Sequence, residues 1–265
     1  MAQPSALLSL MIGAARKAAR GLRRDFGEVE NLQVSRKGPG DFVTAADHRA
    51  EDVILEELQK ARPGYGFLME ERGVIEGTDK SHRWVVDPLD GTSNFMHGVP
   101  HFAISIGLER DGQPVAGVIY NPISDDLFYA EKGKAAFHND RRMRVSARRG
   151  LADALIATGV PHRGRPGHAQ FLTELHRVMP LVSGVRRFGS AALDLAWVAA
   201  GRFDGFWERA LSPWDIAAGV VIVREAGGLV RDADGGPDPL ATGTIMAGPE
   251  EVVVPLLAAV KGEAG

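Results

Sequence analysis

Acidic side chains placed where predicted strands end are the residues of this chain most suited to chemistry. Asp87 closes an apolar run, Pro88 bends the backbone by fixing φ, and Asp90 follows three residues after Asp87. Glu70 and Glu71 come directly after another apolar run. Carboxylates gathered in one place repel each other and stay ionised only with cations between them. Capping of a turn by Asp87 and Asp90 is the alternative interpretation of that pair.

Two further acids stand at the predicted starts of helices. Asp47 lies early in a helix that begins near Ala45, and Asp215 follows Pro213 and Trp214 at the start of another. An acid in the first turn also stabilises the helix dipole, so each has a structural explanation by itself. Together the acids lie at four strand or helix ends, where the active sites of α/β proteins are usually found.

The chemistry of these candidate ligands selects the ion. All of them are oxygen donors, which favours Mg²⁺ or Mn²⁺ over zinc. The chain has no cysteine, which excludes disulfides, thiolate metal sites and a cysteine nucleophile. His97 and His101 have the spacing of a helical zinc pair, but Gly98 and Pro100 between them prevent a regular helix.

The turn that follows Asp90 is suited to a phosphate group. Gly91 has no Cβ atom to obstruct a ligand. Residues 92–94 open a short predicted helix, whose free N–H groups and positive end favour an anion. Acids that hold cations beside this turn would form a pocket that accepts phosphate, because the cations offset the negative charge of the carboxylates.

The elements that must position these residues can be read from apolar periodicity and turn signals. An amphipathic helix opens the chain, since the apolar run with Leu7, Leu8 and Met11 is followed by alanines interleaved with basic residues, and this run is too short to span a membrane. A second helix is predicted over 45–60. Strands are predicted over 66–69, 83–86, 102–109, 115–120 and 127–131, the last three as an antiparallel meander separated by turns.

Strand and helix alternate after about Gly150, which predicts a second α/β half. We expect an N-terminal α+β half over residues 1–145 and a C-terminal half over 146–265, connected by the arginine-rich run Arg141–Gly150. The first half carries Asp47, Glu70, Asp87 and Asp90. The second carries strands at 154–158, 205–207 and 242–247 and helices at 170–179, 191–200, 213–225 and 249–261.

Charge and composition exclude several classes of protein. The 265 residues carry 31 basic and 34 acidic side chains, a net charge of −3, so no basic excess points to nucleic acid. The apolar run at the N-terminus precedes its positive charges, which is the reverse of a signal peptide. With no cysteine, the chain fits a reducing cytoplasm, and we expect neither a nucleic-acid nor a membrane partner.

Two long runs resemble the signatures of the inositol monophosphatase family. The first is Asp87-Pro88-Leu89-Asp90-Gly91-Thr92-Ser93-Asn94-Phe95, and the second is Trp214-Asp215-Ile216-Ala217-Ala218-Gly219 followed by Glu225-Ala226-Gly227-Gly228. Shorter segments match in order and at similar spacing: Asp41–Asp47, Glu70-Glu71, Gly189-Ser190-Ala191-Ala192 and Glu208. The resemblance covers nearly the whole chain.

This resemblance implies a mixed α/β fold of the α+β kind, a layered αβαβα sandwich of the inositol monophosphatase and fructose bisphosphatase type. It also implies a homodimer with phosphatase activity towards a small phosphate ester such as inositol monophosphate. Two or three Mg²⁺ ions for each active site are implied, with Mn²⁺ as a substitute, together with inhibition by lithium.

The metal ligands implied by the resemblance fall on matched positions. Glu70, Asp87 and the carbonyl of Leu89 would hold one metal. A second would be held by Asp87, Asp90 and Asp215. Glu70 would also help to place a third, looser ion.

Further roles concern water, phosphate and substrate. Thr92, supported by Asp47 and acting with Glu70, would orient a metal-activated water for direct attack on phosphorus, without a phosphoenzyme. The amides of Gly91 and Thr92 would bind phosphate. Substrate contacts are expected from Asp90, Gly91, Thr92, Gly189, Ser190, Ala191, Glu208 and Asp215.

Three alternatives stay open from the sequence. The same chemistry could serve a nucleotide 3′-phosphate, fructose 1,6-bisphosphate or histidinol phosphate. A non-catalytic binding or regulatory protein could keep the fold, although it would be expected to have lost ligands. A carboxylate-pair glycosidase is disfavoured by the phosphate-suited turn and by an aromatic content of 7%.

Overall fold

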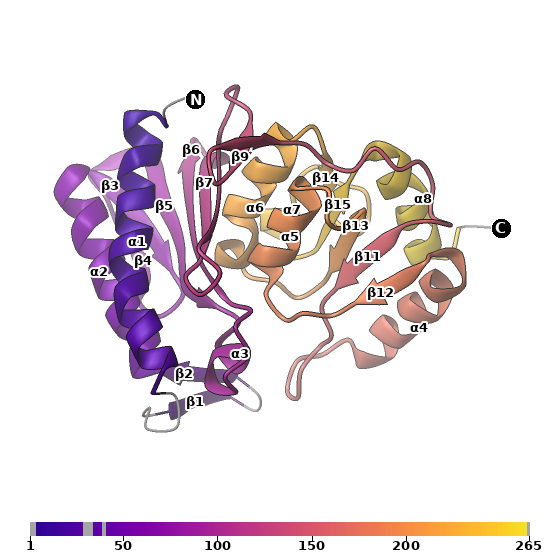
Figure 1. Ribbon diagram of the computed structural model, residues 1–265, viewed down its shortest axis with the longest axis horizontal. Coiled ribbons are helices and arrows are strands. Elements are labelled where there is room, and N and C mark those ends of the chain that lie inside the picture. The colour runs from indigo at the N-terminus through magenta and orange to yellow at the C-terminus, as the bar shows by residue number, and fades with distance from the viewer. Residues whose placement is uncertain (1–3, 29–33, 39–40, 264–265) are drawn as a thin grey trace.

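The chain folds into five stacked layers, in the order helix, sheet, helix, sheet, helix (Figure 1). The computed structural model describes residues 4–28, 34–38 and 41–263. Each layer buries apolar faces against the next, which is the way such folds satisfy amphipathic helices and two-faced sheets. The predicted αβαβα sandwich is confirmed.

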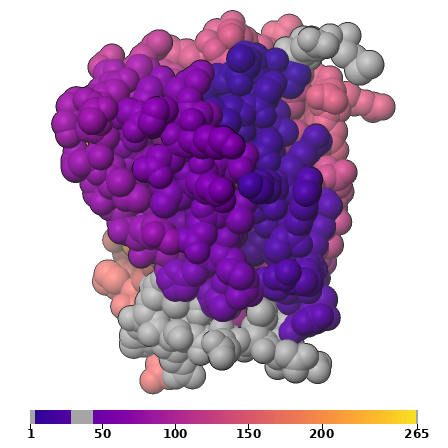
Figure 2. Space-filling view, turned by 90° about the vertical axis from the view of Figure 1, so that its left-hand side faces the viewer, coloured from indigo at the N-terminus to yellow at the C-terminus, as the bar shows by residue number. Residues whose placement is uncertain are grey.

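The first layer consists of two helices that the sequence predicts, α1 (Ala6–Phe26) and α2 (Ala45–Ala61). Ser5 caps α1 by accepting a hydrogen bond from the amide of Leu8 at 3.2 Å. The two helices pack side by side, and in Figure 2 α1 runs down the face as a band of indigo. Their apolar faces cover one side of the first sheet, where Ile54 and Leu58 are fully buried.

The second layer is an eight-stranded sheet. The predicted meander is confirmed, because β5 to β8 pair antiparallel in chain order, whereas β3 pairs with β5 in parallel. In spatial order its strands are β10 (Arg141–Met143), β9 (Ala136–His138), β8 (Asp126–Glu131), β7 (Gln113–Asn121), β6 (Ala103–Arg110), β5 (Asp79–Asp90), β3 (Tyr65–Met69) and β4 (Gly73–Ile75).

The central layer consists of α5 (Ala191–Ala199) and α6 (Pro213–Glu225), which separate the two sheets. Helix α6 lies close against β6 and β7, and glycines make this approach feasible. A Cβ atom at Gly117 would lie 2.5 Å from the carbonyl oxygen of Ala218, so no larger residue fits without moving the helix. Residues of both sheets therefore share one apolar cluster with α5 and α6.

The fourth and fifth layers form the other side of the molecule. The second sheet has five strands, in the order β12 (Gly184–Arg186), β11 (Leu155–Thr158), β13 (Gly205–Glu208), β15 (Ile245–Gly248) and β14 (Leu229–Arg231). Strand β11 pairs in parallel with β12 and β13, and β15 pairs antiparallel with β13 and β14. Its outer face is covered by α4 (His168–Val178) and α8 (Glu250–Lys261).

Several details differ from the sequence prediction. The predicted strand over 242–247 is wrong at its start, because Thr242 ends the short helix α7 (Pro239–Thr242) and the strand begins at Ile245. The predicted connection Arg141–Gly150 begins instead with β10. Short elements that were not predicted are the strands β1 (Val34–Gly38), β2 (Asp41–Thr44), β4, β9, β12 and β14 and the 3₁₀ turn η2 (Met179–Leu181).

The short helix predicted after Gly91 is confirmed as α3 (Thr92–Met96). Within the described part of the chain, no helix has both the length and the apolar character needed to cross a membrane.

Candidate active site

The parallel pairing of β3 with β5 brings Glu70 next to Asp87. Met69 pairs with Val86, and the amide of Glu70 donates to the Val86 carbonyl at 3.2 Å, so the residues that follow both strands lie at one edge. Asp87 is only 2% exposed, and its Oδ1 accepts the amide of Leu89 at 2.9 Å, which closes the turn at Pro88.

Acids from both halves lie close enough for their charges to raise one another's pKa values. Burial raises the pKa of Asp87 well above its ordinary value, and the negative charges of Glu70, Asp90 and Asp215 raise it further. Burial likewise raises the pKa of Asp90 to about 6 and that of Asp215 to about 7. Mutual repulsion of this kind is what a cation would relieve.

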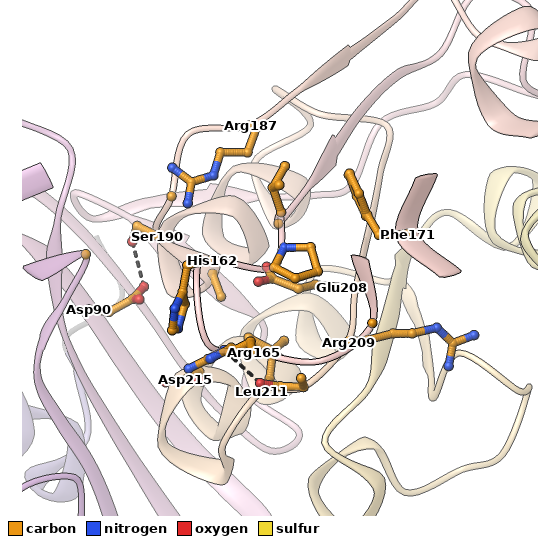
Figure 3. A pocket seen from close by; sticks show the side chains of 18 of the residues that line it. Asp90, His162, Arg165, Phe171, Arg187, Ser190, Glu208, Arg209, Leu211 and Asp215 are labelled. Atoms are coloured by element: carbon orange, nitrogen blue, oxygen red, sulfur yellow. Dashed lines mark hydrogen bonds between the residues drawn. The ribbon is translucent and has the colours of Figure 1, made fainter. Parts of the chain in front are cut away.

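Asp90 connects the two halves directly. Its Oδ2 accepts a hydrogen bond from the Ser190 hydroxyl at 2.6 Å (Figure 3). The same oxygen accepts the amide of Ala192 at 2.8 Å. Gly91 has a φ angle of 99°, and a Cβ atom there would approach the Gly189 carbonyl at 3.3 Å. The turn at Asp90 and the start of α5 are thus fitted to each other.

Thr92 and Asp47 form the pair that the sequence predicts. The Thr92 hydroxyl lies 3.2 Å from Asp47 Oδ1 and 3.1 Å from the Leu89 carbonyl oxygen. Asp47 Oδ2 accepts the amide of Thr44 at 2.9 Å, so the same carboxylate also caps α2. One carboxylate therefore both caps α2 and contacts the Thr92 hydroxyl, and burial raises the pKa of Asp47 to about 6.

Asp215 and Glu208 come from the second half. Asp215 occupies the third position of α6, where its Oδ2 accepts the amide of Ser212 at 2.8 Å. Glu208 ends β13, and burial, followed by the charges of Asp215 and Asp90, raises its pKa to about 8. The guanidinium groups of Arg165 and Arg187 act in the opposite direction on the pKa of Glu208.

A single cavity of about 490 Å³ collects nearly all of the predicted site residues. Asp47 does not line it and reaches it only through Thr92. The predicted residues that line the cavity are Glu70, Asp87, Leu89, Asp90, Gly91, Thr92, Gly189, Ser190, Ala191, Glu208 and Asp215. This volume is in the range of small-molecule sites.

The donor set fits hard divalent cations, because it consists of carboxylate oxygens and the Leu89 carbonyl. The carboxylates are not drawn into ligand geometry, however. Among the residues that the structure describes, no three Asp, Glu or His side chains form a preformed metal cluster. The fit therefore rests on the chemistry of the donors and on their shared cavity.

Sequence reasoning missed the loop that follows β11. His162 and Arg165 line the cavity together with Arg187, and in Figure 3 the side chains of His162 and Arg165 lie near Asp90 and Asp215. The available signal was a run of arginine, glycine and proline directly after a predicted strand, the position at which site loops occur in α/β folds.

A second missed residue is Asn94. Its side-chain amide donates to the carbonyls of His101, at 2.7 Å, and Phe188, at 2.8 Å, and so holds the loop before Ser190 against α3. Nothing in the sequence pairs these distant positions.

Comparisons with known proteins identify the family of the chain. The model of the inositol monophosphatase family matches residues 3–263. The chain is 65% identical over 257 residues to a protein named inositol-1-monophosphatase from Mesorhizobium japonicum, covering 97% of both chains. It is 42% identical over 257 residues to the Nus factor SuhB of Escherichia coli, covering 97% of this chain and 96% of that one.

A solved structure is also similar. The crystal structure of the extragenic suppressor protein suhB from Bartonella henselae superposes with a TM-score of 0.95 at 60% identity, covering 97% of this chain and 99% of that chain.

Proposed function

Because this chain belongs to the inositol monophosphatase family and is a phosphoric monoester hydrolase, we propose that it releases phosphate from inositol monophosphate, or a similarly small polyol phosphate, with Mg²⁺. The observation that carries the proposal is the cavity in which Glu70, Asp87, Asp90 and Asp215 meet beside the Gly91 turn. We further propose that the enzyme acts in the cytoplasm as a homodimer and is inhibited by lithium.

Residues of the proposed metal sites are Glu70, Asp87, the Leu89 carbonyl, Asp90 and Asp215. When bound there, Mg²⁺, with Mn²⁺ as a substitute, supplies positive charge that polarises the phosphate group and makes a water more acidic. The raised pKa values of Asp87, Asp90 and Asp215 support this assignment, since burial first, and then the charges of neighbouring acids, disfavour each carboxylate as an anion.

Thr92 is assigned to orient the attacking water. Its hydroxyl donates to Asp47 or to the Leu89 carbonyl, which leaves its oxygen lone pairs to accept from a water. Glu70 is assigned to accept a proton from that water while the water oxygen attacks phosphorus. Phosphoryl transfer requires mainly this kind of positioning and charge stabilisation from a protein.

The leaving group lies on the other side of the proposed phosphate site. The amides of Gly91 and Thr92 are assigned to the phosphate oxygens, whereas Ser190 and Glu208 are assigned to hydroxyl groups of the substrate. A water beside Asp215 would return a proton to the leaving oxygen. All of these groups line the one cavity, which supports a substrate with several hydroxyl groups next to its phosphate.

A panel of phosphate esters tests the proposal. We expect the purified protein to release phosphate from inositol 1-phosphate with Mg²⁺, and to lose this activity when EDTA removes the metal. The panel includes a nucleotide 3′-phosphate, histidinol phosphate and fructose 1,6-bisphosphate. A relative carries the name Nus factor, so absence of hydrolysis on every ester would favour a non-catalytic role instead.

Fructose 1,6-bisphosphate is a second candidate, which Arg165 favours. Unlike Arg209, which pairs with Glu174 at 2.7 Å, Arg165 forms no ion pair within the described part of the chain. Its guanidinium is anchored on the Ala210 carbonyl at 2.7 Å and lines the cavity, so it could meet a second phosphate.

The neighbouring Arg163, which is exposed and outside the cavity lining, provides the matched control. If a bisphosphate is the substrate, Arg165→Gln should lower kcat/KM for it far more than for inositol 1-phosphate. Arg163→Gln should change neither value. An equal effect of Arg165→Gln on the two esters would remove the support for this candidate.

A further inference from the structure

The space beside Gly159 is occupied by the carboxyl group of Glu208. Strands β11 and β13 run in parallel with Thr158 opposite Trp207, so the next residues, Gly159 and Glu208, lie side by side at the same sheet edge. The Thr158 hydroxyl donates to the Trp207 carbonyl at 2.8 Å, which fixes the two strand ends together. Both residues line the cavity.

A side chain at position 159 would collide with that carboxyl group. An ideal Cβ atom on Gly159 would lie 1.8 Å from Oε1, 1.9 Å from Cδ and 2.3 Å from Oε2 of Glu208. Gly159 does not have a left-handed φ angle, so its backbone conformation is open to other residues. Glycine is required here for space alone.

We propose that Gly159 is a positioning residue for substrate selection: its missing side chain lets the Glu208 carboxyl group settle on the leaving-group side of the cavity, where it contacts a hydroxyl group of the substrate. The inference rests on the proposed function, in which Glu208 meets the polyol. Any larger residue at position 159 would push the carboxyl group away from that place.

The atoms that an added Cβ would meet distinguish the proposed role of Gly159 from that of a glycine needed only for packing. At Gly117 the atoms in the way are the backbone of Ala218, which cannot yield without moving α6. At Gly159 they are the end of a flexible glutamate side chain, which can swing aside. Gly159→Ala is therefore expected to keep the fold and to move Glu208.

The experiment is a double-mutant cycle on selectivity. The ratio of kcat/KM for inositol 1-phosphate to that for 4-nitrophenyl phosphate, which has no hydroxyl groups on its leaving group, is measured for wild type, Gly159→Ala, Glu208→Ala and the double variant. We expect Gly159→Ala to lower this ratio about tenfold, the loss of about one hydrogen bond. In the Glu208→Ala background Gly159→Ala should have no further effect, because the obstructing carboxyl group is gone.

Gly21→Ala provides the matched control, since its added Cβ atom meets open space on α1 and the ratio should stay at the wild-type value. The urea midpoint of Gly159→Ala should equal that of wild type. An unchanged ratio in Gly159→Ala, an unchanged ratio in Glu208→Ala, or equal losses from Gly159→Ala in both backgrounds would overturn the inference.

Failure of the proposed function would appear in the activity of the wild-type protein, not in the comparison of variants. Wild type itself would then release no phosphate from inositol 1-phosphate, which would overturn both the substrate and the role of Gly159 in selecting it. Failure of the inference alone would leave wild-type activity intact and appear only in the variants.

Discussion

The Thr92 hydroxyl lies within hydrogen-bonding distance of two acceptors, Asp47 Oδ1 and the Leu89 carbonyl, and can donate to only one of them at a time. Its lone pairs are therefore free to accept from a water in the cavity. A threonine is well suited to this task, because its β-branched side chain has few rotamers.

Thr92→Val tests this role because it keeps the shape and removes the hydroxyl group. We expect kcat to fall about 100-fold, the loss that follows when a reacting group is held out of position. Thr92→Ser, which keeps the hydroxyl, should retain most of the activity. Steady-state kinetics on inositol 1-phosphate decide the matter, and equal rates for the valine and serine variants would contradict the assignment.

Glu208 gives a pH dependence of stability with a definite sign. Burial and the nearby acids raise its pKa from 4.5 to about 8 in the native protein, so the native state binds more protons than the unfolded chain between these values. Its contribution to stability is full below pH 4.5 and is lost as the pH rises through about 8.

In metal-free protein, the unfolding free energy of wild type should therefore fall relative to Glu208→Gln between about pH 5 and about pH 8. The slope of this fall is at most about 1.4 kcal/mol per pH unit. Because Glu208 lines the cavity, solvent should screen its charge and make the slope smaller. Urea unfolding at three pH values in EDTA measures the slope. Parallel pH profiles for the two proteins would show that Glu208 keeps an ordinary pKa.

At the scale of elements, strand ends and helix starts carry the site. Asp47 and Asp215 each cap the helix on which they lie, and this local role is readable from the sequence, as is the turn around Asp87 and Asp90. The partners of these residues are not readable, because the contact of Asp90 with Ser190 joins positions 100 residues apart. The run of arginine, glycine and proline after β11 marks a loop, but it does not show that Arg165 meets acids from distant parts of the chain.

Helix α6 must lie close to β7 to place Asp215 near the first sheet. A Cβ atom at Gly117 would lie 2.5 Å from the Ala218 carbonyl oxygen, so we expect Gly117→Ala to displace the helix and to cost about 1 to 3 kcal/mol. Activity should fall as well, because Asp215 moves with α6. Urea unfolding and phosphate-release assays measure both effects.

Gly13→Ala, on α1 with open space around its Cβ position, controls for the removal of a glycine. It should leave activity unchanged and raise stability by up to about 1 kcal/mol through helix propensity. If Gly117→Ala were as stable and as active as wild type, the close approach of α6 would not be needed.

At the scale of the whole molecule, the proposed halves 1–145 and 146–265 are divided by their sheets. In chain order, the last strand of the first sheet ends at Met143, and the second sheet begins at β11. The apolar core is not divided in this way, because Phe128 of the first sheet and Phe206 of the second belong to one apolar cluster around α5 and α6. Sequence patterns indicate which residues are apolar but not which sheet they will meet.

The shared cluster predicts that the molecule unfolds as one unit. We expect a single urea transition with the same midpoint whether it is followed by tryptophan fluorescence or by far-ultraviolet circular dichroism. Trp84 lies in the first sheet and Trp207 in the second, so fluorescence reports on both. Two separated transitions would mean that the halves have independent cores.

The central claim is that acids from both halves hold cations that act on a phosphate ester. The most direct test is the rate of phosphate release from inositol 1-phosphate by Asp90→Asn at saturating Mg²⁺. The amide keeps the shape of the side chain and an acceptor for Ser190 but loses the charge, so we predict nearly complete loss of activity in a folded protein. Asp90→Asn with a rate close to that of wild type would contradict the account.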